Sequence, residues 1–181
     1  MQLGVIGLGR MGQIVVERCL ADGHEVVAFD LDPEAVATAA DAGATPAESV
    51  ADLADRLGDE KHVWLMVPAG DAVDATLDDL DPHLDDEDVV VDGGNSHFEA
   101  SVRRAEATAA AYLDCGTSGG PAGADLGFSL MIGGPEWAYE AMTPVFDAVA
   151  TGPAGHDRMG ESGSGHYVKM VHNGVEYALM Q

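Results

Sequence analysis

Four polar side chains near the end of the sequence have the residue types and the spacing of a catalytic site. Lys169 is followed at offsets of three, four and seven positions by His172, Asn173 and Glu176. In a helix, these offsets bring all four side chains to one face. A lysine with a lowered pKa could remove the proton of an alcohol, and a carboxylic acid could return a proton. The spacing therefore predicts acid–base chemistry on a hydroxylated substrate.

Taken singly, the same residues have ordinary explanations. Lys169 could be a surface lysine and His172 an ordinary polar residue, because single residues of these types carry little information. Glu176 is one of 32 acidic residues and alone would be interpreted as a solvated charge. Its seven-residue offset from Lys169 is the observation that favours a shared role.

The N-terminal segment "GLGRMG" has the glycine spacing of a dinucleotide-binding loop. Gly7, Gly9 and Gly12 form the pattern G-x-G-x-x-G between a short apolar run and a helical pattern. The first glycine permits a tight turn, the second lets the backbone approach a pyrophosphate, and the third allows close packing of helix on sheet. Asp30 ends the second apolar run and could accept hydrogen bonds from ribose hydroxyls. The alternative is a glycine turn that binds nothing.

The charges around Asp30 favour NAD over NADP. Asp32 adds a second carboxylate, and the segment "FDLDPEAV" contains no Arg or Lys that could bind a 2′-phosphate. The cofactor-binding residues expected from these two segments are Gly7, Leu8, Gly9, Arg10, Met11, Gly12, Asp30 and Leu31.

Two further loops follow predicted strands and are candidates for ligand contacts. "MVPAG" begins at Met66, and "DGGNSH" begins at Asp92. Because ligands bind outside the carboxyl ends of parallel strands, we expect Val67, Pro68 and Asn95 to lie beside the cofactor. Ordinary strand-to-helix turns are the alternative for both segments.

Short apolar runs alternate with helical patterns along most of the chain. Strands are expected at residues 2–7, 25–30, 62–67, 88–92, 112–118 and 129–134, with a short last strand within 150–155. Helices are expected at residues 11–20, 32–43, 45–58, 71–80, 96–111 and 135–150, and a final helix begins after Gly165. This alternation is typical of an α/β fold with a doubly wound, mostly parallel Rossmann-type sheet.

Capping residues predict where several of these helices begin. Asp32 precedes Pro33 as an N-cap. Thr45 and Glu48 have the spacing of a capping box, and Ser96 is a third candidate cap.

The charge balance excludes some partners and indicates an environment. The chain has 181 residues, with 32 acidic and 8 basic side chains and a formal net charge of −24. Such a surface repels nucleic acid and anionic membranes, and no apolar run is long enough to predict a membrane span. Because the acids are spread over the whole chain and salt screens their repulsion, the composition favours adaptation to high salt over a merely acidic protein. Without a signal-peptide pattern, the expected location is cytoplasmic.

The cysteines and histidines have no metal-ligand spacing. Cys19 and Cys115 are far apart in the sequence and are expected to be small buried apolar residues. His97, His166 and the other histidines show no ligand spacing with Cys or carboxylates, so no metal site is expected.

Together, these motifs resemble the cofactor domain of the 6-phosphogluconate dehydrogenase family. The segments "GLGRMG", "LMVPAG", "DGGNSH", "GTSGGPAGA" and "GHYVKMVHNGVEYALMQ" occur in the family's order and span the chain. The wider β-hydroxyacid dehydrogenase superfamily shares the glycine loop, an S-G-G loop and the Lys and Asn of the last segment. It generally lacks "DGGNS" and the His and Glu of that segment. The resemblance therefore implies an NAD-binding domain over residues 1–160 and, over residues 161–181, the first part of an interdomain helix of a missing all-helical C-terminal domain.

The resemblance also implies an activity and individual roles. The activity is oxidative decarboxylation of 6-phospho-D-gluconate to ribulose 5-phosphate and carbon dioxide with reduction of NAD, in the pentose phosphate pathway and gluconate utilization. Lys169 would be the general base for the C3 hydroxyl, and Glu176 the acid that protonates the enediol. The substrate contacts that it implies are Asn95, Ser118, Gly119, Gly120, His172, Asn173 and Tyr177, with Tyr177 near the phosphate. The nicotinamide contacts that it implies are Val67 and Asn95.

The chain departs from the common family pattern near the cofactor. Many members have an Asn-Arg-Thr-type segment for the 2′-phosphate of NADP, where this chain reads "DLD". Thr117 before the S-G-G segment also matches the NAD-type branch. The full-length enzyme is expected to be a homodimer or homotetramer. Two other functions stay open: another β-hydroxyacid dehydrogenase, such as one acting on 3-hydroxyisobutyrate, and a non-catalytic NAD-binding module for the chain in isolation.

Overall fold

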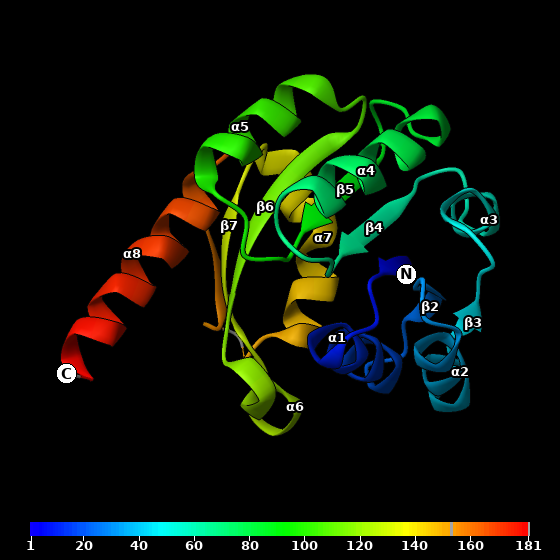
Figure 1. Cartoon of the computed structure of the whole chain (residues 1–181), viewed down its shortest axis with the longest axis horizontal. Helices are drawn as coiled ribbons and strands as arrows, with labels where there is room; N and C mark the ends of the chain where they lie inside the picture. The colour runs from blue at the N-terminus through cyan, green and yellow to red at the C-terminus, as the bar shows by residue number, and fades with distance from the viewer. Residues whose placement is uncertain (153, 181) are drawn as a thin grey trace.

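A mixed sheet forms the centre of the protein (Figure 1). The computed structural model describes residues 1–152 and 154–180, and within them the sheet has eight strands. The strands are β1 Gln2–Ile6, β2 Glu25–Phe29, β3 Thr45–Pro46, β4 His62–Leu65, β5 Val89–Asp92, β6 Ala111–Ser118, β7 Ser129–Gly133 and β8 His156–Gly160. Their order is β3-β2-β1-β4-β5-β6-β7-β8, and neighbours are parallel except for β6 and β7. The doubly wound, mostly parallel sheet predicted from the sequence is confirmed.

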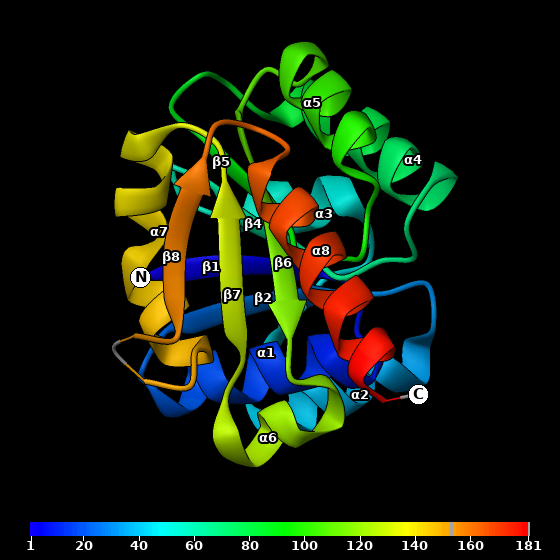
Figure 2. The ribbon, with the colours of Figure 1, turned by 90° about the vertical axis from the view of Figure 1, so that its left-hand side faces the viewer.

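Helices cover both faces of this sheet. They are α1 Arg10–Ala21, α2 Pro33–Ala42, α3 Val50–Arg56, α4 Asp71–Leu80, α5 Phe98–Ala107, α6 Gly123–Leu126, α7 Glu136–Val149 and α8 Ser164–Leu179, with short 3-10 turns at η1 Asp81–His83 and η2 Gly120–Ala122. Helices α1, α2 and α7 pack on one face, and α3, α4 and α5 pack on the other. The last helix, α8, lies over β6 and β7 next to α5 (Figure 2).

Two apolar layers hold the helices to the sheet. Neighbouring residues of β4 lie in opposite apolar layers, because successive side chains of a strand point to opposite faces of the sheet. Trp64 meets Phe146 of α7 edge to face, with ring centroids 5.8 Å apart. Leu65 belongs to the other layer, with Leu53 of α3 and Leu77 of α4. Burial of each such side chain stabilises the fold by roughly 1.5–3 kcal/mol.

The winding of the chain reverses next to β1. From β1 the chain proceeds to β2 and β3 at one edge, then returns to β4 and continues toward the other edge. Such a reversal leaves a crevice outside the carboxyl ends of the strands, because the loops from the two halves turn away from each other. The segments "MVPAG" and "DGGNSH" follow β4 and β5 and therefore begin beside this crevice.

The expected capping box at Thr45 and Glu48 is wrong. Thr45 and Pro46 form the edge strand β3 and pair with β2. A proline is tolerated at a sheet edge, where its missing N–H is not needed. Helix α3 begins after Ser49, whose Oγ accepts a hydrogen bond of 3.0 Å from the amide of Asp52. The Asp52 carboxylate in turn accepts a hydrogen bond of 2.8 Å from the Glu48 amide. Ser49 and Asp52 therefore cap this helix in place of Thr45 and Glu48.

The other two predicted caps have different outcomes. Asp32 caps α2 as expected, since its side chain accepts a hydrogen bond from the Glu34 amide. Ser96 is not a cap. His97 occupies the N-cap of α5, and its Nδ1 accepts a hydrogen bond of 3.3 Å from the Glu99 amide. The Ser96 hydroxyl is used elsewhere, in a buried cluster beneath the loop that follows β5.

The last strand also lies later than expected. Ala150 makes an isolated bridge with Phe128, and Pro153, inside the predicted strand, falls outside the described residues. The strand is β8, which reads "HDRMG" and pairs with β7. This sequence contains no apolar run because one side of the strand is exposed, so the pattern of a buried strand was absent.

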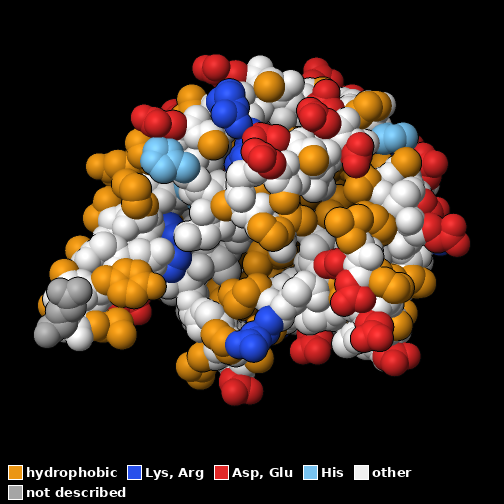
Figure 3. Space-filling model, viewed as in Figure 1, with side chains coloured by type: hydrophobic (Ala, Val, Ile, Leu, Met, Phe, Trp, Pro, Cys, Tyr) orange, Lys and Arg blue, Asp and Glu red, His pale blue; other side chains and the backbone are white. Residues whose placement is uncertain are grey.

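The surface has two contrasting regions (Figure 3). Acidic side chains are spread over much of the face shown, whereas the projecting end of α8 carries apolar side chains. The exposed apolar residues on or next to this helix are Tyr167, Met170, Val171, Val175, Tyr177, Leu179 and Met180. An apolar helix face of this kind is typical of a surface that another element covers. Among the described helices, none is long and apolar enough to cross a membrane.

Candidate functional site

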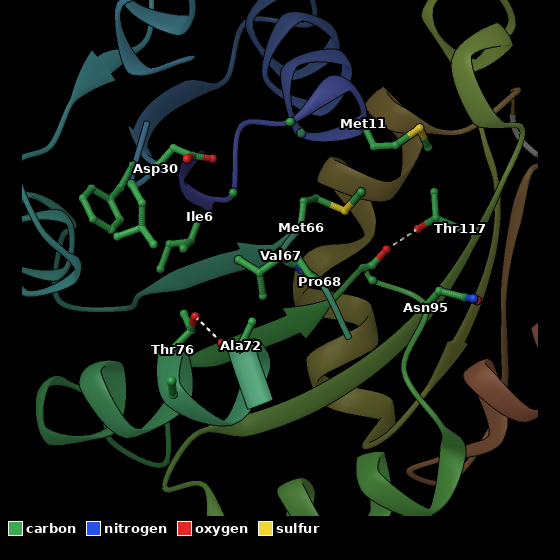
Figure 4. A pocket seen from close by; sticks show the side chains of 18 of the residues that line it. Ile6, Met11, Asp30, Met66, Val67, Pro68, Ala72, Thr76, Asn95 and Thr117 are labelled. Carbon is green, nitrogen blue, oxygen red and sulfur yellow. Dashed lines mark hydrogen bonds between the residues drawn. The ribbon is translucent and has the colours of Figure 1, made fainter. Parts of the chain in front are cut away.

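A cleft of about 880 Å³ opens at the carboxyl ends of the central strands (Figure 4). Asp30 lies at one end of this cleft, and Asn95 and Thr117 lie at the other, with Val67 and Pro68 between them. Ligand pockets usually measure about 300–1,000 Å³, so the cleft is large enough for an extended cofactor.

Glycine is required at each of the three positions of the loop between β1 and α1, for a different physical reason at each. Gly7 has φ +94°, and a Cβ there would lie 2.6 Å from the carbonyl oxygen of Met66. A Cβ on Gly12 would overlap the carbonyl oxygen of Gly7, so helix α1 packs this closely only with glycine. Gly9 has no neighbouring atom within 4 Å of a Cβ position and faces open space in the cleft. Because Gly9 is also the N-cap of α1 and provides no side-chain cap, the first amides of the helix are free to bind a pyrophosphate.

The carboxylate of Asp30 is tied to the glycine loop. Its Oδ2 accepts a hydrogen bond of 2.5 Å from the amide of Leu8, and its Oδ1 accepts one of 2.8 Å from the amide of Asp32. Each oxygen keeps a second lone pair for a ribose hydroxyl. Leu31 lines the cleft and is 92% exposed. The Leu8 side chain is buried in the core, so its backbone amide is the part that belongs to the site.

Sequence reasoning missed one wall of the cleft. The lining residues it did not anticipate are Ile6, Phe29, Ser49, Val50, Ala72, Ala75, Thr76, Asp79 and Thr117, whereas Met66, Gly93 and Gly94 belong to the two predicted loops. Four of them share one face of α4, at offsets of three, four and seven from Ala72. This face of small and polar residues lies beside the core stripe of Val73, Leu77 and Leu80. In the sequence, this stripe of small residues was the signal that could have indicated that α4 lines the cleft.

The loop after β5 is held at the far end of the cleft. Thr117 Oγ1 donates a hydrogen bond of 3.2 Å to the carbonyl oxygen of Gly93, which joins β6 to this loop. Thr117 lines the cleft, whereas Ser118 and the following glycines do not. Gly119 and Gly120 have φ +136° and +51° and lead into η2. The S-G-G segment is therefore adjacent to the cleft through Thr117, and its substrate contacts stay a prediction.

Helix α8 is anchored on the sheet at its first turn. Asp114 of β6 is buried and accepts hydrogen bonds of 2.6 and 2.7 Å from the amides of Gly163 and His166. A Cβ on Gly116 would overlap the Cβ of Lys169, so the glycine allows the helix to approach the strand. Together, the cap and the close approach bring Lys169 to the edge of the cleft.

The structure brings part of the predicted stripe into the cleft. Lys169 and Asn173 line it. His172 and Glu176 are exposed, and His172 Nδ1 lies 3.8 Å from Glu176 Oε2. Tyr177 is 68% exposed, on the projecting part of the helix. All four residues lie on α8, but only Lys169 and Asn173 line the cleft, and the roles of the four side chains stay predictions.

Burial adjusts the acid–base properties of Lys169. The side chain is only 9% exposed. Burial lowers the pKa of Lys169 below the ordinary value of a lysine, and the charge of Glu176 opposes part of this shift. A lowered pKa increases the fraction of neutral amine near neutral pH, which is the form that accepts a proton.

The cysteines are structural residues. Cys19 and Cys115 are both free and buried, as expected from the sequence. Burial raises the pKa of the Cys19 thiol to about 12, so this side chain stays a neutral thiol. Within residues 1–152 and 154–180, no group of three or more His, Cys, Asp or Glu side chains is placed to hold a metal ion.

The fold and the cleft define a class of protein. A doubly wound sheet, a glycine loop at the start of α1 and an acid at the end of β2 are the features of a Rossmann-type dinucleotide-binding domain. The chain belongs to the family of NAD-binding domains of 6-phosphogluconate dehydrogenase, whose model matches residues 2–167.

Curated relatives agree with this family. The chain is 84% identical over 181 residues to the NAD(+)-dependent, decarboxylating 6-phosphogluconate dehydrogenase of Haloferax volcanii, covering all of this chain and 60% of that protein. It is 42% identical over 191 residues to the decarboxylating 6-phosphogluconate dehydrogenase of Cunninghamella elegans, covering 99% of this chain and 39% of that protein. The chain thus spans less than two thirds of the length of these relatives.

Solved structures have the same architecture. The Plasmodium falciparum 6-phosphogluconate dehydrogenase aligns with a TM-score of 0.89 and 31% identity, over 99% of this chain and 41% of that one. The Mycobacterium tuberculosis 3-hydroxyisobutyrate dehydrogenase aligns with a TM-score of 0.87 and 25% identity, over 96% of this chain and 59% of that one.

Proposed function

We propose that the chain is the cofactor-binding part of an enzyme that oxidises and decarboxylates 6-phospho-D-gluconate, giving ribulose 5-phosphate, carbon dioxide and reduced NAD. The observation that carries this proposal is Lys169, which is buried at the edge of the cleft and lines it together with Asn95 and Asn173. The Haloferax volcanii relative, an NAD(+)-dependent, decarboxylating 6-phosphogluconate dehydrogenase, supports the same reaction. The pathway that uses this reaction is the pentose phosphate pathway, and the expected location is the cytoplasm.

The residues of the cleft match the steps of this reaction. NAD bound in the cleft would supply the hydride acceptor. Neutral Lys169 would take the proton of the C3 hydroxyl, which favours loss of hydride from the same carbon. The side-chain amides of Asn95 and Asn173 each offer a donor and an acceptor for substrate oxygens. Glu176 would return a proton to the enediol after carbon dioxide has left.

We also propose that α8 begins a second, helical domain. Residues 161–181 would belong to this second domain, with α8 as its first helix, after the cofactor domain of residues 1–160. The exposed apolar face of α8 supports this division, as does the greater length of the relatives. Helices packed on this face would bring His172, Glu176 and Tyr177 against the substrate. Dimers or tetramers of the full-length enzyme would then form through the added domain.

The direct test is turnover by the full-length protein that contains this chain. We expect carbon dioxide release and NAD reduction with 6-phosphogluconate. The matched substrate is 3-hydroxyisobutyrate, because the Mycobacterium tuberculosis enzyme has the same fold. Turnover of 3-hydroxyisobutyrate without turnover of 6-phosphogluconate would replace the proposed function by the alternative. The 181-residue chain alone is expected to bind NAD without turnover.

The cofactor end predicts a preference for NAD over NADP. The Asp30 carboxylate, which is bonded to the glycine loop, would itself hold the ribose hydroxyls, and Asp32 places a second charge at the start of α2. A 2′-phosphate between these charges would be repelled, so NADP should bind at least about tenfold more weakly than NAD. Isothermal titration of the full-length protein with both cofactors measures the ratio. Equal or tighter binding of NADP would contradict the proposed role of Asp30.

The acidic surface predicts stabilisation by salt. Screening of the net charge of −24 should raise the melting temperature by about 10 °C between about 0.1 M and 2 M KCl. A variant with Asp41, Asp55 and Asp86 changed to Asn is the matched control, because these three side chains are exposed. Its melting temperature should rise less steeply with KCl. A flat or falling salt series for the unmodified protein would refute the proposed adaptation to high salt.

A further inference from the structure

A buried polar cluster lies directly beneath the loop that carries Asn95. Its members are Asp92, Ser96, Arg104 and Tyr112, with exposed fractions of 0%, 8%, 3% and 1%. Arg104 is on α5, Tyr112 is on β6, and the other two belong to the end of β5 and the loop that follows it. A buried guanidinium is costly unless it is paired and fully hydrogen-bonded, so its partners define what it does.

Asp92 holds the residues on both sides of Asn95, Gly94 by its backbone amide and Ser96 by its hydroxyl. Its Oδ1 accepts a hydrogen bond of 3.0 Å from the amide of Gly94. Its Oδ2 accepts hydrogen bonds of 2.7 Å from the hydroxyl of Ser96 and 2.7 Å from the hydroxyl of Tyr112. Burial raises the pKa of Tyr112, which keeps this phenol a neutral donor. The residues before and after Asn95 are therefore held by one carboxylate.

Arg104 connects this loop to the loop that follows β4. Its Nη1 lies 3.0 Å from Ser96 Oγ and 3.4 Å from Asp92 Oδ2. Its Nη2 donates a hydrogen bond of 3.0 Å to the carbonyl oxygen of Gly70, which ends the segment "MVPAG". Its Nε donates one of 2.8 Å to Asp74, in the first turn of α4. One planar guanidinium thus binds the ends of both loops that flank the cleft.

We propose that Arg104 is a positioning residue for the nicotinamide half of the cofactor: it sets the separation of the loops at residues 66–70 and 92–96, between which the nicotinamide binds. The inference rests on the proposed function for the role of Asn95 there. Val67 and Asn95 line the cleft from these two loops. The adenosine half would lie at the other end of the cleft, at Asp30, whereas the hydrogen bonds of Arg104 are all to the two loops and the first turn of α4. The hydrogen bonds of Arg104 to both loops form what we call the Arg104 clamp. Loss of this clamp should weaken binding of the nicotinamide half of NAD more than binding of the adenosine half.

Only a guanidinium makes all of these contacts at once. Its donors point in fixed directions from one plane, whereas a lysine ammonium is a single point charge that reaches one loop at a time. Arg103 is the matched control, because it is the adjacent residue, has the same charge and is exposed. Its described contact is to Asp74, with Nη2 lying 3.1 Å from both carboxylate oxygens.

The test compares NAD with ADP-ribose, which lacks the nicotinamide, as ligands of the full-length protein. The variants are Arg104→Lys, Arg104→Met and Arg103→Met. For both Arg104 variants, the affinity for NAD should fall about tenfold more than the affinity for ADP-ribose, because the loops lose their spacing. For Arg103→Met, both affinities should stay within about twofold of the unmodified protein. Calorimetric titration gives the two dissociation constants.

The outcomes separate positioning from general instability. Equal losses for NAD and ADP-ribose would overturn the proposal, as would an Arg104→Lys variant that binds NAD normally. If Arg104→Met does not fold, Arg104→Lys decides alone, since it keeps the buried charge. Turnover of 6-phosphogluconate by the unmodified protein is measured in parallel. Absence of this turnover would refute the proposed function. The ratio of the affinities for NAD and ADP-ribose would still test the role of Arg104.

Discussion

Replacement of Lys169 by methionine is expected to lower kcat for 6-phosphogluconate by about 10²–10⁴-fold, the usual contribution of a general base. The substitution keeps the apolar stem packed against Gly116 and removes the amine from the cleft. Binding of NAD should change little, because the pyrophosphate and ribose are held at the other end. Steady-state kinetics of the full-length protein, together with NAD titration, measure both quantities.

A second variant distinguishes the base from a positive charge. Lys169→Arg keeps the charge, but a guanidinium stays protonated and cannot accept the proton. We expect this variant to lose activity to a similar extent. Substantial activity in Lys169→Arg would show that the cleft needs a cation there and would remove Lys169 from the role of base.

The pH profile of the same enzyme gives an independent test. A lysine base acts in its neutral form, so kcat/KM should rise with pH through the pKa of Lys169. Burial lowers this pKa, which moves the rise below the range of an ordinary lysine, and the charge of Glu176 raises it in part. Glu176→Gln should therefore move the rise to lower pH, in addition to lowering kcat. A shift to higher pH would contradict the electrostatic relation between the two residues.

The second large effect concerns the glycine loop, where two similar substitutions should weaken NAD binding for different reasons. Gly12→Ala places a Cβ against the carbonyl oxygen of Gly7, so helix α1 must move away from the sheet. We expect a loss of stability of about 1–3 kcal/mol, as for other overpacked sites, and loss of NAD binding. Gly9→Ala meets no atom of the protein within 4 Å and should melt at the normal temperature.

Gly9→Ala should nevertheless weaken NAD binding by at least about tenfold, because its methyl group occupies the space in which the pyrophosphate approaches the backbone. Thermal melts and NAD titrations on both variants separate the two effects. Normal NAD affinity in Gly9→Ala would mean that the pyrophosphate does not lie over this residue.

The sequence determined the features that depend on neighbours in the chain. The spacing of Gly7, Gly9 and Gly12 predicted the cofactor loop, and Asp32 predicted the start of α2, because turns and caps are formed by residues a few positions apart. The alternation of apolar runs with helical patterns predicted the doubly wound sheet for a similar reason, since each run must bury its own apolar face.

Local patterns failed where a distant partner decides the conformation. Thr45 and Glu48 have the spacing of a capping box, but pairing with β2 draws Thr45 and Pro46 into the sheet. β8 has no apolar run, and its pairing with β7 makes it a strand. In both cases, hydrogen bonds between segments far apart in the chain outweigh the local preference.

Only the tertiary structure decided which residues of the predicted stripe enter the cleft. Lys169 and Glu176 share a face of α8, yet Lys169 is buried and Glu176 is exposed. The physical reason is that Gly116 and the Asp114 cap hold the first turns of the helix against β6, after which the helix projects away from the sheet (Figure 1). The clamp at Arg104 was likewise invisible in the sequence, because its partners come from separate segments that only the folded chain brings together.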